Sequence, residues 1–311
     1  MPLSTTEEHD MQTRHSAARA LLWLLALAVP LAASAQSKVD ERRPLAKGGR
    51  IELENVAGAI QVRGWERDEV ALSGELGADL RLDTDASRDR VQFRVVYPRD
   101  NRDSRNRGAR LELRVPKGSE LLVSGVSAGL DIADVDLRRL NARSVSGKVV
   151  AAGRAQEAEL GSVSGSVQSL LTTTRLKATS VSGGVKAEGG ITGEASLETV
   201  SGRIELSAGR IERLQAQSVS GATSLRVAAL APGGRIGAES VSGRIDLSLP
   251  ADTSAAVRIT TFSGGIQSPV GEVEKPRYGP GRKLETRLGQ GNGDITLTSH
   301  SGSVNLSVPG R

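Results

Sequence analysis

The chain has 311 residues, of which 38% are hydrophobic, and a formal net charge of +5 at pH 7. It contains no cysteine, so its stability must come from burial and hydrogen bonding rather than from disulfides. Three histidines and two residues each of Trp, Tyr and Phe leave little capacity for general acid–base catalysis or for stacking against sugars and single-stranded nucleic acid.

Residues 1–35 have the pattern of a secretory signal peptide. Arg14 and Arg19 precede an apolar run over residues 20–32, and Ala33-Ser34-Ala35 supplies a small-residue cleavage site. The apolar run is short for a membrane span, so we expect a cleaved signal and an exported protein without a transmembrane segment. We expect the protein in the periplasm or at the cell surface, with an uncleaved N-terminal anchor as the alternative.

Residues 36–123 are expected to form a β cap that is continuous with the repeats that follow. Their β-type stretches are RIELENVAGAIQVRGW, DEVALSGEL, DRVQFRVVYP and ARLELRVP, separated by Gly and Pro turn signals. An uncovered apolar end of a repeat array would tend to associate with other chains, so a cap is physically reasonable at this position.

A dense run of arginines falls between Tyr97 and Leu111. Its members are Arg99, Arg102, Arg105, Arg107 and Arg110. Such a run suggests an anionic partner, which could be surface polysaccharide, lipid phosphate or nucleic acid. Because Asp100 and Asp103 dilute the charge and no aromatic side chain interleaves, a solvated hairpin loop is the simpler interpretation, and we expect no nucleic-acid partner.

Residues 124–311 are dominated by a repeated tetrapeptide, Ser-Val-Ser-Gly or a close variant. Its Ser-Gly pairs are Ser146 and Gly147, Ser164 and Gly165, Ser182 and Gly183, Ser201 and Gly202, Ser220 and Gly221, Ser242 and Gly243, Ser263 and Gly264, and Ser301 and Gly302. Successive glycines are 18 to 22 residues apart until the last interval, which is 38. We expect the long interval to hide one degenerate or expanded repeat, with an inserted loop at 268–293 that is rich in Gly, Pro and charge.

Each repeat is predicted to form two short strands joined at the Ser-Gly turn. Apolar residues alternate with polar ones on both sides of the turn, and no repeat has the period of a helix. Equivalent strands of successive repeats would pair in parallel about 4.8 Å apart. The predicted fold is therefore all-β: a single-chain parallel β-solenoid of about 18–20 residues per coil with a β-rich N-terminal cap.

The motif residues are expected to have structural roles at the turn of each coil. Glycine is expected because it adopts positive φ without a Cβ penalty, and serine because its hydroxyl bonds nearby backbone or stacks into a ladder. The hydroxyl residue before the valine shares its alternation phase with the apolar positions and is expected to point inward. It is Ser144, Ser162, Ser180, Thr199, Ser218, Ser240, Thr261 or Ser299.

The valine of the motif is expected to point outward or to lie at an edge, since Phe262 and His300 replace it in two repeats. A row of outward valines is either a contact stripe for a partner or a partly shielded corner without one. Single exposed apolar residues are common on protein surfaces, which favours the second interpretation.

The sequence offers no catalytic, cofactor or metal site that we can assign. After removal of the signal, His300 is the remaining histidine, and Asp131, Asp134 and Asp136 lie along one strand rather than across a cleft. An EF-hand-like stretch has Arg88 where a glycine is required, and no phosphate-loop motif occurs. We therefore expect no catalytic residue, no cofactor and no metal.

Two stretches carry a family resemblance: LENVAGAIQVRGWERDEVALSG at residues 53–74 and GNGDITLTSHSGSVNL at residues 291–306, with Ser-Gly-x-Ile/Val repeats between them. Over residues 39–308 the sequence resembles the bacterial "putative adhesin" family of β-solenoid domains of unknown function. The resemblance implies an exported cell-envelope protein, and the family assigns no catalytic residues.

The expected function is that of an exported, non-enzymatic, adhesin-like binding or scaffold protein of the cell envelope. Its expected partner is an envelope polysaccharide or another envelope protein. One alternative is a self-assembling structural protein that associates end to end through an open terminal coil, although Pro309 and Arg311 would blunt that edge. The other is a polysaccharide-active β-helix enzyme.

Overall fold

The computed structural model describes residues 37–98 and 108–310. The chain divides after Ala35, and the described residues belong to the unit that begins at Gln36. These residues are all-β and form one large sheet of 19 strands, without a helix. In this part of the chain no helix is long and apolar enough to span a membrane.

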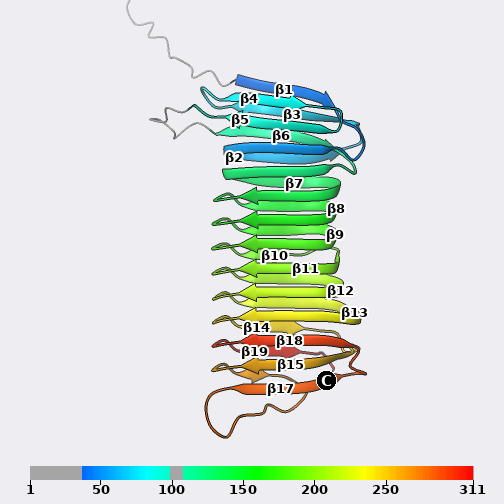
Figure 1. The fold of residues 1–311 in the computed structure, drawn as a ribbon, viewed down its shortest axis with the longest axis vertical. Helices are drawn as coiled ribbons and strands as arrows, with labels where there is room; N and C mark the ends of the chain where they lie inside the picture. Colours follow the sequence, from blue (N-terminus) through cyan, green and yellow to red (C-terminus); the bar gives the residue numbers. More distant parts are fainter. Residues whose placement is uncertain (1–36, 99–107, 311) are drawn as a thin grey trace, which may run out of the picture. The chain divides into compact units, whose positions relative to one another are not determined.

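Six strands form the N-terminal region. They are β1 (Ser37–Pro44), β2 (Arg50–Trp65), β3 (Glu69–Leu76), β4 (Arg81–Ala86), β5 (Arg90–Val96) and β6 (Ala109–Pro116). The first half of β2 pairs in parallel with β5 and the second half with β6, while β7 pairs with both halves. β3 adds antiparallel to β6, β1 to β3 and β4 to β5, which leaves β1 and β4 as outer strands (Figure 1).

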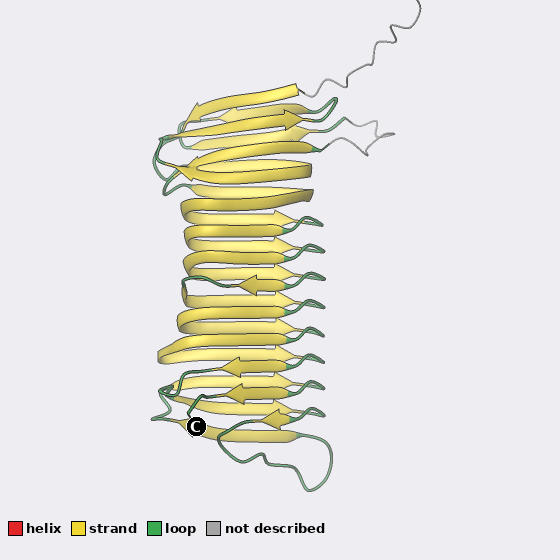
Figure 2. Ribbon diagram, turned by 180° about the vertical axis from the view of Figure 1, so that it is seen from behind, coloured by secondary structure: helices red, strands yellow, loops and turns green. Residues whose placement is uncertain are grey.

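The Ser-Val-Ser-Gly repeats build a stack of parallel strands. Its members are β7 (Glu120–Ser144), β8 (Val149–Ser162), β9 (Val167–Ser180), β10 (Val185–Ala187), β11 (Ile191–Thr199), β12 (Ile204–Ser218) and β13 (Thr223–Ser240). Apart from register shifts such as the one after Ile132, residues pair with their equivalents in the next repeat, as Ala142 does with Leu160 and Leu160 with Ala178. Figure 2 shows the turns in one row along the stack, so the arrangement is β-solenoid-like.

Alternation along each strand places the apolar side chains inside the stack. In β9, buried and exposed positions alternate, and Leu171, Leu176 and Ala178 lie inside. Equivalent positions of the neighbouring strands are buried too, so the core is a continuous set of stacked aliphatic side chains. The predicted period of two is confirmed, because adjacent side chains of a strand point to opposite faces.

The C-terminal coils do not stack in the order of the sequence. Their strands are β14 (Ile245–Ser248), β15 (Ala255–Thr261), β16 (Ile266–Gln267), β17 (Arg282–Leu288), β18 (Gly293–Ser299) and β19 (Val304–Ser307). β18 pairs in parallel with β13 on one side and β15 on the other, and β19 lies likewise between β14 and β16. The last coil therefore inserts between two coils that precede it in the chain (Figure 1).

This order corrects the prediction that the interval of 38 residues hides an expanded coil. The chain leaves the stack after β16, adds β17 antiparallel to β15, and returns through β18. Residues 268–293, expected as an inserted loop, thus contain a strand. The interval is long because the chain adds β17 outside β15 and then returns to the other side of β15 as β18. The period of the sequence does not encode this non-local pairing.

Candidate ligand-binding groove beside the valine column

The motif glycines form one column in which each contacts its neighbour. A Cβ atom placed on Gly165 or Gly183 would lie under 3.0 Å from the carbonyl oxygen of the preceding glycine. In stack order the column is Gly147, Gly165, Gly183, Gly202, Gly221, Gly243, Gly302 and Gly264. None of these glycines has positive φ, so the expected reason for glycine is wrong. Glycine is required because the coils approach too closely for any side chain.

The first hydroxyl of each motif is buried and joins two coils. In seven motifs it accepts a hydrogen bond from the N–H of the motif glycine at 2.8–3.1 Å. Ser144, Ser162, Ser180 and Thr199 also donate to a carbonyl of the preceding coil at 3.0–3.2 Å. The prediction that these residues point inward is confirmed by exposed fractions of 1–7%.

The second serine of each motif lies at the surface. These residues are Ser146, Ser164, Ser182, Ser201, Ser220, Ser242, Ser263 and Ser301. Their N–H groups donate at 2.7–3.0 Å to the carbonyl of the valine-position residue in the neighbouring coil. Among the described residues, the ladder suggested by stacking therefore runs through backbone groups and the first hydroxyl, not from hydroxyl to hydroxyl.

The residue between the two hydroxyls points outward. Together with Val56 and Val126, which have the equivalent position in the two preceding coils, it forms an exposed column that we call the valine column. In stack order its members are Val56, Val126, Val145, Val163, Val181, Val200, Val219, Val241, His300 and Phe262. Apart from His300, these side chains are 42–50% exposed. The predicted outward orientation is confirmed, and the exposed residues lie in a continuous row instead of being scattered.

Two rings form the C-terminal end of the valine column. Phe262 and His300 stack with 4.7 Å between ring centroids and 6° between their planes. They are neighbours because the last coil lies between the coils of Val241 and Phe262. The Ser301 N–H donates to the Val241 carbonyl at 2.7 Å, and the Ser263 N–H donates to the His300 carbonyl at 2.8 Å.

A groove of about 1050 Å³ runs beside this end of the valine column. Its lining includes six members of the valine column, which we call its floor: Val181, Val200, Val219, Val241, His300 and Phe262. The first hydroxyls of these turns, and Ser162, also line the groove. Its long wall comes from the outward-facing residues just before the first hydroxyls, which are Thr179, Glu198, Gln217, Glu239, Thr298 and Thr260. Each coil therefore contributes one floor residue and one wall residue.

The segment between β16 and β17 closes one end of the groove. Its lining residues are Glu274, Lys275, Pro276 and Gly281, followed by Arg282 and Lys283 of β17. Glu274 and Lys283 exchange two backbone hydrogen bonds at 2.8 and 3.0 Å, and the Arg282 guanidinium donates to the Gly264 carbonyl. Val270 packs against the core. The segment is thus anchored to the stack and forms a fixed end wall.

Charge is segregated along the groove. Glu198 and Glu239 lie on the long wall, whereas the closed end has Lys275, Arg282 and Lys283 against one carboxylate, Glu274. The Lys283 ammonium group contacts Glu285 at 2.8 Å, whereas no ion pair of Lys275 occurs within residues 37–98 and 108–310. The groove therefore combines an apolar floor with one cationic end.

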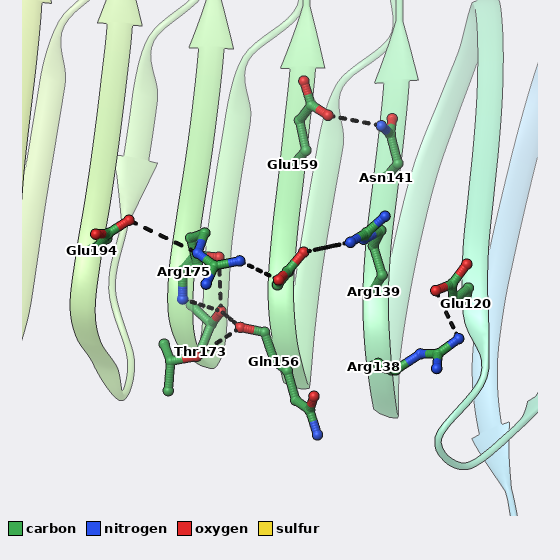
Figure 3. Close-up of polar contacts among 11 residues, drawn as sticks. Glu120, Arg138, Arg139, Asn141, Gln156, Glu159, Thr173, Arg175 and Glu194 are labelled. Atoms are coloured by element: carbon green, nitrogen blue, oxygen red, sulfur yellow. Dashed lines mark hydrogen bonds and ion pairs between the residues drawn. The ribbon is translucent and has the colours of Figure 1, made fainter. Parts of the chain in front are cut away.

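Outside the groove, charged side chains alternate in sign along one line of the stack. Arg139, Glu157, Arg175, Glu194 and Arg213 occupy equivalent positions in successive coils. Each contacts the next, at 2.9 Å for Arg139–Glu157 and 3.8 Å for Arg175–Glu194. Figure 3 shows Arg139, Arg175 and Glu194 of this line. Burial raises the pKa of Glu157, but the two arginines outweigh it and lower that pKa overall. This line is a mutually paired surface network.

The other predicted site residues lie apart from the groove. Arg110 is exposed on β6, and the rest of that cluster lies outside the described residues: Arg99, Arg102, Arg105 and Arg107. Asp131 pairs with Arg63 at 3.4 Å, and Asp136 with Arg154 at 3.6 Å. The described residues contain no cluster of three or more potential metal ligands.

Sequence analysis missed the groove, although it placed the valines outward. The missing information is the end wall, because residues 268–281 have no periodic pattern that would place them beside the valine column. The available signal was the replacement of valine by Phe262 and His300, which marked two coils as different from the others.

The chain belongs to the Toastrack DUF4097 family, whose model matches residues 50–307. That range includes the coils and most of the N-terminal region, and it agrees with the resemblance seen in the sequence. Among curated proteins, none matches the chain significantly.

Solved structures of bacterial proteins also match most of the chain at low sequence identity. A "putative lipid binding protein" from Parabacteroides distasonis ATCC 8503 is 13% identical, has a TM-score of 0.48, and is matched over 87% of this chain and 97% of its own. A "putative adhesin" from the same strain is 10% identical, with a TM-score of 0.43 and coverage of 88% and 98%. One from Bacteroides fragilis NCTC 9343 is 11% identical, with a TM-score of 0.41 and coverage of 88% and 99%. Similarity this distant transfers no ligand or role.

Proposed function

We propose that this protein is an exported, non-enzymatic parallel β-solenoid of about 18–20 residues per coil that binds a component of the cell envelope in an adhesin-like role. The observation that carries the proposal is the groove beside the valine column. Six consecutive members of the column form its floor, and the chain builds a wall across one end. A contiguous exposed apolar strip usually marks an interaction site.

Export is proposed from residues 1–35, which lie outside the described residues. Their basic start, apolar run and small-residue end have the order of a secretory signal. N-terminal sequencing of the protein from cell fractions tests this step. We expect a mature chain that begins at Gln36 in the envelope fraction, whereas a chain that keeps residues 1–35 in the cytoplasm would contradict export.

Binding can be tested with the purified protein on immobilised envelope polysaccharides, envelope lipids and washed envelope fragments. The informative variant is Val219→Asp, which puts a charge on the groove floor. Val145→Asp is its matched control, because Val145 occupies the same turn position outside the groove and is 43% exposed against 45% for Val219.

We expect Val219→Asp to lose binding while Val145→Asp keeps it. Equal loss in both variants would contradict the role of the groove, and release of products from a polysaccharide would favour an enzyme. Circular dichroism of both variants controls for folding.

End-to-end association through the last coil is a less favoured alternative. β18 and β19 lie inside the stack, and Lys283 of the outermost strand β17 already exchanges backbone hydrogen bonds with Glu274. We expect a molar mass that stays constant with concentration in light scattering. A mass that rises with concentration would favour self-assembly.

A further inference from the structure

We infer that the groove binds a single-chain anionic lipid, with its acyl chain along the valine column and its anionic head at the closed end. The inference rests on the proposed binding role of the groove and specifies the chemical class of its ligand. Three features of the groove support it. They are the floor, whose backbone hydrogen bonds are already made within the protein, the length of the groove, and its distribution of charge.

The floor of the groove has few hydrogen-bonding groups left to offer. The Val200 carbonyl accepts from the Ser220 N–H at 2.9 Å. The Thr199 hydroxyl accepts from the Gly202 N–H at 3.1 Å and donates to the Gly183 carbonyl at 3.2 Å. The Ser162 and Ser180 hydroxyls bond in the same way. An extended peptide or glycan on this floor would lose hydrogen bonds to water and could replace them only at the polar side chains of the long wall. An acyl chain carries no such groups.

The groove has the length that an acyl chain needs. From Val181 to Phe262 the floor spans five coil-to-coil steps, which is about 24 Å at 4.8 Å per step. A lipid chain in one bilayer leaflet spans about 15 Å, half the thickness of the hydrocarbon core. One chain can therefore lie fully extended along the floor, with its methylenes beside one valine, histidine or phenylalanine side chain at each coil.

The charges of the groove give the ligand a sign and a direction. Lys275, Arg282 and Lys283 lie at the closed end together with one lining carboxylate, Glu274, so this end has three cations against one anion. Glu198 and Glu239 on the long wall would repel an anion placed near the middle. An anionic head at the closed end, with the chain directed toward Val181, satisfies both conditions.

The first experiment measures binding of hexadecanoate to the purified protein by titration calorimetry below the micellar concentration. We expect one molecule bound per chain. Val219→Asp should weaken binding by at least about tenfold, because the charge would be buried against methylenes. Val145→Asp, the matched control outside the groove, should change it by less than about twofold.

A second pair of variants tests the position of the head. Lys275→Glu should weaken hexadecanoate binding by about fivefold or more, whereas Lys148→Glu, at an exposed position outside the groove, should not. Hexadecyltrimethylammonium has the same chain with a cationic head and should bind at least about tenfold more weakly than hexadecanoate.

Several results would overturn the inference. They are equal effects of Val219→Asp and Val145→Asp, equal binding of the two amphiphiles, or binding to anionic phospholipid vesicles without binding of hexadecanoate. A different result separates the two proposals. If the protein binds envelope polysaccharide but not hexadecanoate, and Val219→Asp abolishes the polysaccharide binding, the lipid inference fails and the proposed function stands. If the protein binds nothing in either assay, both fail.

Discussion

Gly183 lies so close to the Gly165 carbonyl that a Cβ atom cannot fit between the two coils. The Ser180 hydroxyl accepts from the Gly183 N–H at 3.0 Å and donates to that same carbonyl at 3.1 Å. One glycine and one hydroxyl thus permit the close approach and satisfy the backbone at the corner. Because every coil repeats this pair, the valines of successive coils align on the outside.

Replacing Gly183 with alanine should destabilise the protein by about 1–3 kcal/mol, since the coils must shift to admit a methyl group. Urea unfolding measures this difference. Gly129→Ala is the matched control, because Gly129 has open space around its Cβ position and no positive φ. The control should stay within about 0.5 kcal/mol, and equal losses in the two variants would contradict the packing argument.

The two serines of one motif should differ sharply in their contribution to stability. Ser180→Ala leaves the Gly183 N–H and the Gly165 carbonyl without their hydroxyl partner, and should cost about 1–3 kcal/mol. Ser182→Ala removes a surface hydroxyl and should change stability by less than about 0.5 kcal/mol. Thermal unfolding of both variants would reject this assignment if Ser182→Ala were the more damaging.

Among the elements, β18 and β19 determine how the C-terminal end is built. They pair with strands on both sides, so the last coil joins β13 and β14 to β15 and β16. This placement brings His300 against Phe262. The end-wall segment between β16 and β17 lines the end of the groove, and Arg282 and Lys283 of β17 line it too. The groove is therefore a consequence of the inserted coil.

Engineered cysteine pairs can test the coil order, because the chain contains no cysteine of its own. Ser242→Cys with Ser301→Cys places the two residues in adjacent coils, about 4.8 Å apart and within disulfide reach. Ser242→Cys with Ser263→Cys places them two coils apart, at about 9.6 Å. On oxidation we expect a disulfide in the first pair only. A disulfide in the second pair alone would show sequential stacking.

The charge line through Glu157 should give a small, pH-dependent stabilisation. Arg139 and Arg175 lower the pKa of this carboxyl, so their stabilisation is present above the unfolded-state pKa of about 4.3 and is lost as pH falls through the folded-state value. Because the groups are exposed, Glu157→Gln should lower Tm by no more than about 3 °C at pH 7, and by less in acid or 1 M salt. A larger loss in acid than at pH 7 would contradict this sign.

Across the whole described unit, stability is expected to arise from contacts between neighbouring coils, as in other repeat proteins. The outer strands β1 and β17 carry charge that discourages further strand pairing. β1 has Arg42 and Arg43 beside Asp40 and Glu41. In β17, the Glu285 carboxylate contacts Lys283 of the same strand and Arg258 of β15, and these two cations lower the pKa of Glu285.

The regular part of this unit could be predicted from the sequence, because its causes are local. Alternation fixed which residues are buried, and the hydroxyl before each valine shared the phase of Leu and Ala positions such as Leu160 and Ala178. The tolerance of Val, Phe262 and His300 at one motif position correctly indicated that this position faces outward.

The irregular part could not be predicted, because its causes are non-local. Nothing in residues 293–307 shows that they pair with β13 rather than follow β16. The glycine contacts also depend on the spacing between coils, so sequence analysis attributed them to positive φ. The groove needs both the inserted coil and the end wall, and therefore required the structure.

Methyl NMR of the valine-labelled protein, titrated with hexadecanoate, tests the groove most directly. Each exposed valine of the column serves as a probe in an equivalent turn. We expect shift changes at Val181, Val200, Val219 and Val241, and none at Val126 or Val145. Changes of equal size along the whole column, or changes that spare Val219, would show that the groove is not the binding site.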